Sequence, residues 1–395
     1  QRCSELCGLC TIALRNARHV YTTKPDFDEW WSHGVIVPIV DMNGDGFPDL
    51  LKERDHPVLD RHTQLGVSLN DQDGSFNPPI WSEGGINMSG LPKDIVAVDI
   101  DGDQDLDVIV SGRSREQGSP VFWVMLNNGA GQFGAPKQYA VDVDIGGPLA
   151  VADLDGDNAL DLIMFARRND GEPGTIEVYF NDGGGTLVWE ERIQTRLVTA
   201  ADVQTFDLTN NDRPDIIISG SVDYRTVSIE TFLTSNRGNI DPAQVHATEF
   251  DEPQVLNIFT SANDAVSIVM PNGNGKLQKA TIDPQGRVSP WDESPTSRHC
   301  EGRNFENECT RWPRVKALAM GDLNGDDRLD MVVRTQDRTL SVFTQSEGGN
   351  FFTPKTMPLD QETGDGLWVV DINQDGRLDV GVDHEVPNIG DHDTD

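Results

Sequence analysis

The sequence predicts an all-β fold built from seven repeats of about four short strands each. Three observations predict it. An acidic nine-residue segment recurs along the chain, β-branched residues stand on both sides of most copies, and a turn rich in Asn and Gly follows about half a repeat later. Strands separated by such turns are typical of antiparallel sheets, and a repeat period decides the architecture.

The clearest copy of the acidic segment spans residues 99–107 and reads Asp-Ile-Asp-Gly-Asp-Gln-Asp-Leu-Asp. Carboxylates occupy positions 1, 3, 5 and 9, and Asp105 at position 7 can offer its backbone carbonyl. Ca²⁺ takes about six to eight oxygen ligands from a flexible loop, whereas carboxylates this close repel one another without a cation. The segment is not an EF-hand, because position 12 is Val110 and not Glu. Residues 95–98 and 108–110 are predicted as the flanking strands.

Five copies keep enough oxygen donors to predict one Ca²⁺ each, and they start at residues 41, 99, 153, 322 and 371. In each copy the ligands are the side chains at positions 1, 3, 5 and 9 and the carbonyl at position 7. The predicted ligands are Asp41, Asn43, Asp45, Phe47 and Asp49; Asp99, Asp101, Asp103, Asp105 and Asp107; Asp153, Asp155, Asp157, Ala159 and Asp161; Asp322, Asn324, Asp326, Arg328 and Asp330; and Asp371, Asn373, Asp375, Arg377 and Asp379.

Two further copies are degenerate. In residues 207–215 only the first and last carboxylates remain at ligand positions, and Asp212 stands where glycine is usual, so weak binding or none is expected. The interval of 115 residues between the copies at 207 and 322 is about two repeats, which predicts a copy near its middle. Residues 259–267 fit that place, but Phe259 and Ser267 replace the outer carboxylates, so no ion is expected there.

The second motif of each repeat is a hairpin turn, as in Asn127-Asn128-Gly129 and Asn181-Asp182-Gly183. Asn-Gly and Asp-Gly tolerate positive φ and make tight hairpins. The alternation of metal loop and hairpin resembles FG-GAP/VCBS repeats, the family that builds the propeller of integrin α subunits. The resemblance covers nearly the whole chain and implies a seven-bladed β-propeller with one calcium in each well-formed blade. It leaves function open, because the family includes adhesion proteins, lectin-like modules and domains attached to enzymes.

The expected organisation is a cysteine-rich segment at 1–10, the propeller at 11–383 with an insert at 289–314, and an acidic tail at 384–395. The seventh repeat runs out after two strands, near residue 383. An isolated hairpin-like segment lies at residues 11–24, and a propeller has to close its ring. We therefore expect residues 11–24 to supply the outer strands of the last blade.

Composition excludes several classes of partner. The formal net charge is −35, which argues against nucleic acids and anionic membranes, and no apolar run reaches the ~18 residues needed to span a bilayer. Disulfides suit the five cysteines better than a zinc site, which would need paired spacing and a fourth ligand. Cys300 and Cys309 could close the insert, and Cys3, Cys7 and Cys10 leave one cysteine that is free or pairs with another chain. We therefore expect a secreted protein or one in an oxidising organelle lumen.

No nucleophile elbow, P-loop or His-Glu-x-x-His motif occurs in the sequence. His56 and His62 stand in a charged segment that has the residue types of a lyase site, but an exposed polar loop is the preferred explanation. Trp291 and Trp312 are expected to be the most exposed tryptophans, because they lie in the insert. Three functions stay open: a non-catalytic interaction module for adhesion or assembly with a protein partner, a carbohydrate-binding propeller, and a polysaccharide lyase-type enzyme. The first is preferred.

Overall fold

The computed structural model describes residues 39–55, 62–72, 76–89, 92–143, 145–167, 171–223, 226–235, 239–241, 244–247, 257–260, 266–271, 276–295, 302–303, 309–311, 313–346, 350–351, 354–359 and 367–382. These residues form only strands, turns and connections, and every strand pair is antiparallel. Among them no helix is long and apolar enough to cross a bilayer. The described part of the chain is therefore all-β, as predicted.

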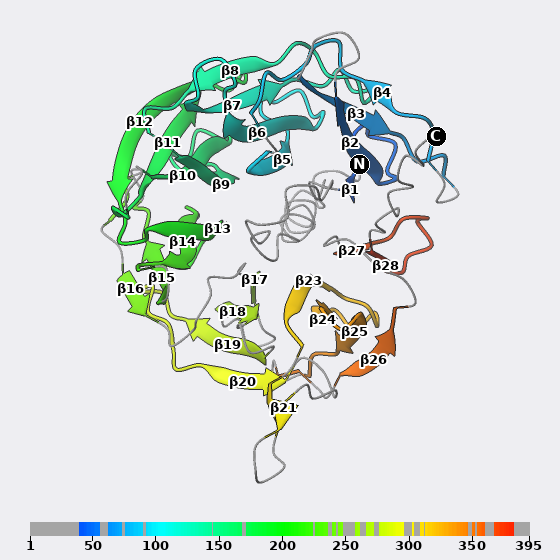
Figure 1. Cartoon of the computed structure of the whole chain (residues 1–395), viewed down its shortest axis with the longest axis vertical. Coiled ribbons are helices and arrows are strands. Elements are labelled where there is room, and N and C mark those ends of the chain that lie inside the picture. Colours follow the sequence, from blue (N-terminus) through cyan, green and yellow to red (C-terminus); the bar gives the residue numbers. More distant parts are fainter. Residues whose placement is uncertain are drawn as a thin grey trace, which may run out of the picture.

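Six sheets contain four strands each, and in each sheet neighbouring strands are consecutive in the sequence. They are arranged as blades around a ring (Figure 1), which makes the fold a β-propeller. Blade 1 holds β1 (Ile39–Val40), β2 (Asp49–Asp55), β3 (Thr63–Ser68) and β4 (Ile80–Trp81); blade 2 holds β5 (Asp94–Val98), β6 (Asp107–Arg113), β7 (Pro120–Met125) and β8 (Lys137–Ala140). Blade 3 holds β9 (Ile145–Ala152), β10 (Asp161–Arg167), β11 (Thr175–Asn181) and β12 (Leu187–Gln194); blade 4 holds β13 (Thr199–Phe206), β14 (Asp215–Ser221), β15 (Val227–Phe232) and β16 (Gln244–Ala247). Blade 5 holds β17 (Asn257–Thr260), β18 (Val266–Pro271), β19 (Lys276–Ile282) and β20 (Asp292–Pro295); blade 6 holds β23 (Val315–Gly321), β24 (Asp330–Thr335), β25 (Thr339–Phe343) and β26 (Lys355–Pro358).

The predicted number of blades needs correction. The described residues form six four-stranded blades and not seven. β27 (Leu367–Val370) and β28 (Asp379–Val382) pair only with each other, and this two-stranded sheet lies between blade 6 and blade 1 (Figure 1). Residues 11–24, which were expected to complete it, lie outside the described residues.

The predicted insert also begins too early. β20 falls within residues 289–314 and pairs with β19 as the outermost strand of blade 5. A separate two-stranded sheet, β21 (Gly302–Arg303) and β22 (Cys309–Arg311), follows it. Cys309 therefore belongs to a strand, while the other four cysteines lie outside the described residues, and the disulfides stay a prediction. Outer strands such as β20 are short and polar, so the sequence pattern of a strand is weak there.

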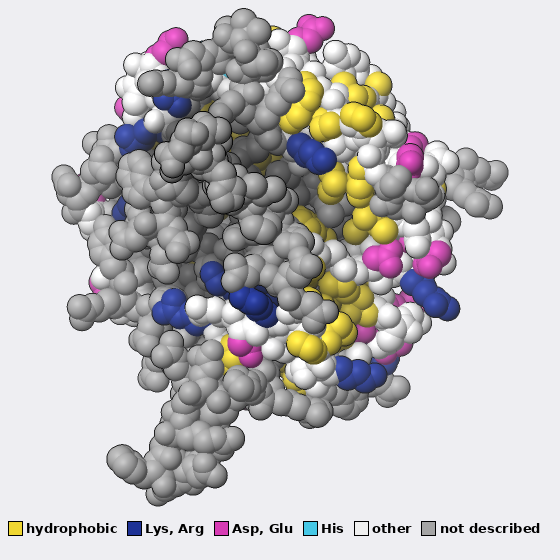
Figure 2. All heavy atoms as spheres, turned by 45° about the vertical axis from the view of Figure 1, so that its right-hand side comes forward, with side chains coloured by type: hydrophobic (Ala, Val, Ile, Leu, Met, Phe, Trp, Pro, Cys, Tyr) yellow, Lys and Arg dark blue, Asp and Glu magenta, His cyan; other side chains and the backbone are white. Residues whose placement is uncertain are grey.

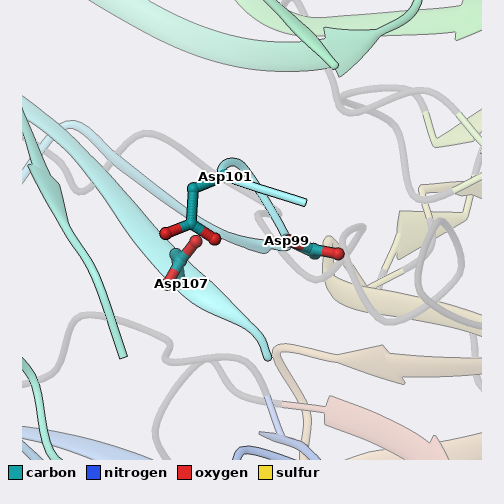
Figure 3. Close-up of side chains that lie close together, drawn as sticks. All are labelled: Asp99, Asp101 and Asp107. Carbon is teal, nitrogen blue, oxygen red and sulfur yellow. The ribbon is translucent and has the colours of Figure 1, made fainter. Parts of the chain in front are cut away.

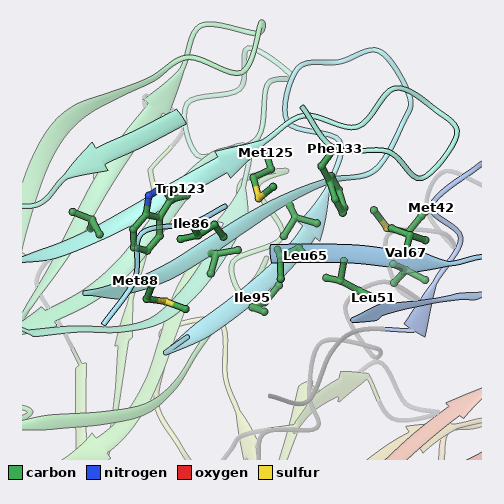
Figure 4. Packing of buried hydrophobic residues seen from close by; sticks show 14 residues of the cluster. Met42, Leu51, Leu65, Val67, Ile86, Met88, Ile95, Trp123, Met125 and Phe133 are labelled. Carbon is green, nitrogen blue, oxygen red and sulfur yellow. The ribbon is translucent and has the colours of Figure 1, made fainter. Parts of the chain in front are cut away.

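Apolar side chains of facing blades form the core. The central strands are buried on both faces, as all six residues of β7 and of β15 show. One cluster joins blade 1 to blade 2 through Val67, Leu51, Val110 and Trp123, and Figure 4 shows this packing. Corresponding clusters fill the next interfaces up to the one between blade 6 and β27. Each blade thus needs its neighbours to bury both of its faces.

Candidate functional site

The residue at position 9 of the acidic loop begins the second strand of each sheet that has such a loop, and it is buried in blades 1 to 4 and 6. Asp107, which is 0% exposed, accepts hydrogen bonds from the Ile100 amide to Oδ2 at 3.1 Å and from the Asn127 amide to Oδ1 at 2.7 Å. Asp49, Asp161 and Asp215 accept the equivalent pairs of bonds. This side chain therefore fastens both the start of the loop and the hairpin turn of its own blade.

The carboxylate at position 1 folds the loop around itself. Asp99 accepts hydrogen bonds from the Gly102 amide at 2.8 Å and from the Gln104 amide at 3.0 Å. Gln104 at position 6 has a φ of 78°, a left-handed conformation that is uncommon outside glycine. Position 6 is left-handed in five other loops as well, where it is Gly46, Asn158, Asp212, Asp327 or Gly376. Sequence reasoning noticed the glycines but missed this shared backbone requirement.

Two loops bring three carboxylates together. One oxygen each of Asp99, Asp101 and Asp107 lies within 4.8 Å of the others, and the same holds for Asp153, Asp155 and Asp161. Figure 3 shows Asp101 and Asp107 facing each other beside the turn that carries Asp99. The position 5 side chains, Asp103 and Asp157, are not part of these groups; each accepts a hydrogen bond from the amide at position 7. The loops at 41, 322 and 371 show no such group of acidic side chains within the described residues.

The electrostatics of these groups fit a hard cation. Burial raises the pKa of Asp107 to about 7; the Asn127 and Ile100 amides lower the pKa, and the nearby Asp101 and Asp103 carboxylates raise it. Burial likewise raises the pKa of Asp161 to about 7 and that of Asp49 to about 6. Without a cation these carboxylates resist ionisation, because burial disfavours the charged form and other carboxylates stand nearby. Oxygen donors of this kind match Ca²⁺.

Two loops already have an arginine beside their carboxylates. Arg213, from the degenerate loop of blade 4, places Nη1 3.8 Å from Asp153 Oδ1 in the loop of blade 3. Arg328 in the loop of blade 6 makes an ion pair with Asp326 and donates from Nε to the Gln345 carbonyl at 3.3 Å. A bound Ca²⁺ in either loop would therefore share its ligands with a guanidinium.

The degenerate loops differ from each other. In blade 4, Asp207 still accepts bonds from the amides of Asn211 at 3.1 Å and Asp212 at 2.9 Å, so the loop keeps its shape with few carboxylates. In blade 5, Phe259 pairs with Ser267 and Thr260 with Val266. The strand ladder thus continues into the segment predicted as a loop, while residues 261–265 lie outside the described part of the chain.

A feature that sequence reasoning missed joins neighbouring blades. Asn127 donates from Nδ2 to the Met42 carbonyl in the loop of blade 1 at 2.6 Å, and also to the Leu106 carbonyl of its own blade at 3.0 Å. The other two members of the set, which we call the seam asparagines, are Asn181 and Asn70. Asn181 donates to the Ile100 carbonyl in the loop of blade 2 at 2.7 Å, and Asn70 donates to the Ile372 carbonyl in the loop between β27 and β28 at 2.9 Å. The recurrence of Asn 20 or 21 residues after position 9 was the available signal.

The other predicted candidates are scattered. His56 lies outside the described residues, and His62 is half-buried just before β3. Trp291 is partly buried against the cluster between blades 4 and 5, and Trp312 lies outside the described residues. Among the described tryptophans, the most exposed is Trp189 in β12, at 51%.

A ring of four-stranded blades with acidic loops at the turn between the first two strands defines the chain as a β-propeller with acidic loops. The sequence pattern of the FG-GAP-like repeat matches residues 41–110, 99–164, 153–218 and 322–382, which is more than half of the chain. The chain belongs to the FG-GAP-like repeat family.

Comparison with solved structures shows the same fold at low sequence identity. BBS1N, crystallised in complex with ARL6DN, is 13% identical with a TM-score of 0.54, and the match covers 89% of this chain and 92% of that one. The BP39L lectin of Burkholderia pseudomallei is 11% identical with a TM-score of 0.55, covering 87% and 91%. The periplasmic gluconolactonase PpgL of Pseudomonas aeruginosa is 12% identical with a TM-score of 0.52, covering 79% and 82%. No curated protein sequence matches the chain. Propellers with such different roles share this fold, so the fold does not determine the function.

Proposed function

We propose that the protein is a non-catalytic interaction module, stabilised by calcium, that works outside the cell or in an oxidising organelle lumen. Repetition is the observation that carries this proposal: the carboxylates at positions 1 and 9 receive the same backbone hydrogen bonds in one loop after another. A catalytic centre needs a single constellation of side chains, whereas repeated ion sites suit a scaffold that holds many loops in place. The family membership and the five cysteines are consistent with this role.

Calcium would be held by the loops that start at residues 41, 99, 153, 322 and 371. When bound, each ion would neutralise the carboxylates of its loop and supply a common centre for their oxygens. The chain itself contributes the shape of the loop, since the carboxylates at positions 1 and 9 are already fixed by backbone amides. The loop of blade 2 has the most carboxylates and no arginine within it, so we expect it to bind most tightly.

Metal content and thermal melting test this proposal. Extracellular calcium sites have Kd values of about 10⁻⁴–10⁻³ M, so millimolar calcium adds about 0.4–1.4 kcal/mol for each site by mass action. About five ions per chain and a lower melting temperature in EDTA are expected. An unchanged melting temperature together with near-zero bound metal would sink the proposal.

The partner is proposed to be a protein with a basic surface. The net charge of −35, even after partial neutralisation by calcium, favours a cationic surface through electrostatic complementarity. Cross-linking in the native source, followed by purification, should recover a basic protein in calcium but not in EDTA. Recovery of the same neighbours with and without calcium would contradict the role given to the loops.

We also infer that β27 and β28 are the inner half of a seventh blade that residues 11–24 complete. Asn70 joins blade 1 to the loop between these strands, which supports their place in the ring. Val380 in β28 is 36% exposed. Figure 2 shows hydrophobic side chains on the right half of the face that it turns to the front. Deleting residues 1–24 should destabilise the whole ring. If the truncated protein melts like the full chain, this closure is wrong.

A further inference from the structure

Trp189 presents an aromatic ring on the outer edge of blade 3. It belongs to β12, the edge strand of that blade (Figure 1), and is 51% exposed, whereas Trp123 in β7 is 2% exposed. The ring is nevertheless fixed, because the indole Nε1 donates a hydrogen bond to Glu177 Oε2 at 2.9 Å. An exposed tryptophan whose polar edge is tied down offers a flat apolar face to a ligand.

A β-bulge aims this ring at the polar side chains beside it. In the pairing of β11 with β12, Val178 faces Glu191 and Tyr179 faces Trp189, so Glu190 is the extra residue. Bulges commonly redirect side chains next to binding sites. Here the bulge lets Trp189 and Arg192 of the same strand both contact the carboxylate of Glu177.

That carboxylate belongs to Glu177, which is 1% exposed. Arg192 Nε donates to Glu177 Oε1 at 2.7 Å, and Thr175 Oγ1 donates to the same oxygen at 2.7 Å. With the bond from Trp189, three donors satisfy the buried carboxylate. The group is therefore a built polar cluster, since a buried charge is retained only where it is paired.

A cavity of about 290 Å³ adjoins this cluster. Thr175 and Arg192 line it together with Arg167, Glu172 and Gln194. Binding pockets for small molecules span about 300–1,000 Å³, so this cavity is at the small end of that range and suits one sugar ring. Arg192 uses Nε for Glu177 and Nη2 for the Asp142 carbonyl, which leaves Nη1 for a ligand, and the exposed Gln194 amide makes no side-chain hydrogen bond with other described residues.

The charges around the cavity select the class of ligand. One carboxylate, that of Glu172, and the two guanidinium groups of Arg167 and Arg192 line the cavity. The Arg192 charge is already compensated by Glu177. Among the described residues the charges at the cavity therefore balance, so it holds no excess positive charge for an acidic sugar, and a neutral sugar is favoured.

We propose that Trp189, Arg192 and Gln194 form a binding site for one neutral pyranose residue. The apolar face of the sugar stacks on Trp189. Its hydroxyl groups accept a hydrogen bond from Arg192 Nη1, and they both donate to and accept from the side-chain amide of Gln194. The site goes beyond the proposed function, because it requires neither calcium nor a protein partner.

Saturation-transfer NMR with the methyl glycosides of glucose, galactose, mannose, fucose and N-acetylglucosamine tests the site. At least one should bind the full chain, and W189A should weaken its binding at least tenfold. Q194A, which removes an exposed side chain without such bonds, should weaken it several-fold at unchanged melting temperature. V188A is the matched control, because Val188 is its neighbour in β12 and is 58% exposed; binding should be unaffected.

Three results would overturn the proposal: no glycoside of the panel binds, W189A and Q194A bind like the unmodified chain, or methyl glucuronide binds more tightly than methyl glucoside. Binding that persists in EDTA, at a temperature where the protein stays folded, supports it. Because the glycan test does not depend on bound metal, its failure is distinguishable from a failure of the calcium proposal.

Discussion

Replacing Asn127 with alanine tests whether the seam asparagines hold neighbouring blades together. The side chain is 6% exposed, and its Nδ2 donates to carbonyls of two different blades, those of Met42 and Leu106. Each lost hydrogen bond costs about 0.5–1.5 kcal/mol, and a buried carbonyl left without a donor costs about 1–3 kcal/mol. The two costs overlap, because the lost bond and the unsatisfied carbonyl describe the same contact. For the two contacts of Asn127 together, we expect N127A to lower the free energy of unfolding by about 2–4 kcal/mol.

Urea unfolding followed by fluorescence measures this loss, and thermal melting gives a second estimate. A change of 1 kcal/mol moves the melting temperature by about 2–4 °C in domains of 150–250 residues and by less in longer chains, so a fall of about 4–8 °C is expected. N128A is the matched control, because Asn128 is exposed in the same turn and its side chain bonds only within that turn. Surface substitutions usually change the free energy of unfolding by less than ~0.5 kcal/mol. If the free energies of unfolding of N127A and N128A differ by no more than that, the seam asparagines do not hold neighbouring blades together.

Other changes probe the loops and the pH response. R213A should raise the calcium affinity of the blade 3 loop about 2–5-fold, the range for a partly exposed ion pair, because it removes the guanidinium 3.8 Å from Asp153; isothermal titration calorimetry showing equal or weaker binding would contradict this. D107N should lower the melting temperature even in EDTA, because the carboxylate accepts two backbone amides, whereas D103N should weaken calcium binding with little effect in EDTA. Burial raises the pKa of Glu230 above its ordinary value of 4.5. The contribution of the protonated Glu230 to stability is therefore present below pH 4.5 and is lost as pH rises through the raised folded-state pKa. In saturating calcium, E230Q should lose less stability than the unmodified chain as pH rises from 4.5 through that pKa. If the two proteins lose stability equally with pH, Glu230 does not have the raised pKa.

The repeat and its strand boundaries could be predicted from the sequence because one side chain fixes both. Position 9 of the acidic loop accepts an amide from the loop and another from the hairpin, so the residue that marks the motif also begins the second strand. Five loops follow this rule, and at Asp379 only the bond from the loop is present among the described residues. The second strand begins at position 9 in all six, as at Asp49 and Asp107. The carboxylate that marks the motif in the sequence is thus also the group that fixes where the second strand begins.

The remaining features depend on contacts that one strand's sequence does not contain. In blade 5 the ladder pairs Thr260 with Val266 inside the segment predicted as a loop, and neither strand's sequence marks that pairing. The exposure of Trp189 follows from the bulge beside Tyr179, and a bulge is invisible in a pattern of alternating residues. The seam contacts end on backbone carbonyls of another blade, so only the donor side of each contact leaves a trace in the sequence.

The seam asparagines are distributed unevenly around the ring. They tie blade 1 to the sheet of β27 and β28, blade 2 to blade 1, and blade 3 to blade 2. Thr234 and Gln345 occupy the corresponding places in blades 4 and 6, where their amides bond to position 9, yet Thr234 Oγ1 and Gln345 Nε2 are buried without a hydrogen-bond partner among the described residues. One arc of the propeller, blades 1 to 3, thus has these cross-blade amide bonds, whereas in the second arc the described residues of blades 4 and 6 lack them at the corresponding places. Slow fluctuations should concentrate in the second arc, so amide protons there should exchange sooner. A ligand that inserts between blades should therefore do so most easily at blades 4 to 6. The contact between blade 1 and the sheet of β27 and β28 would stay intact.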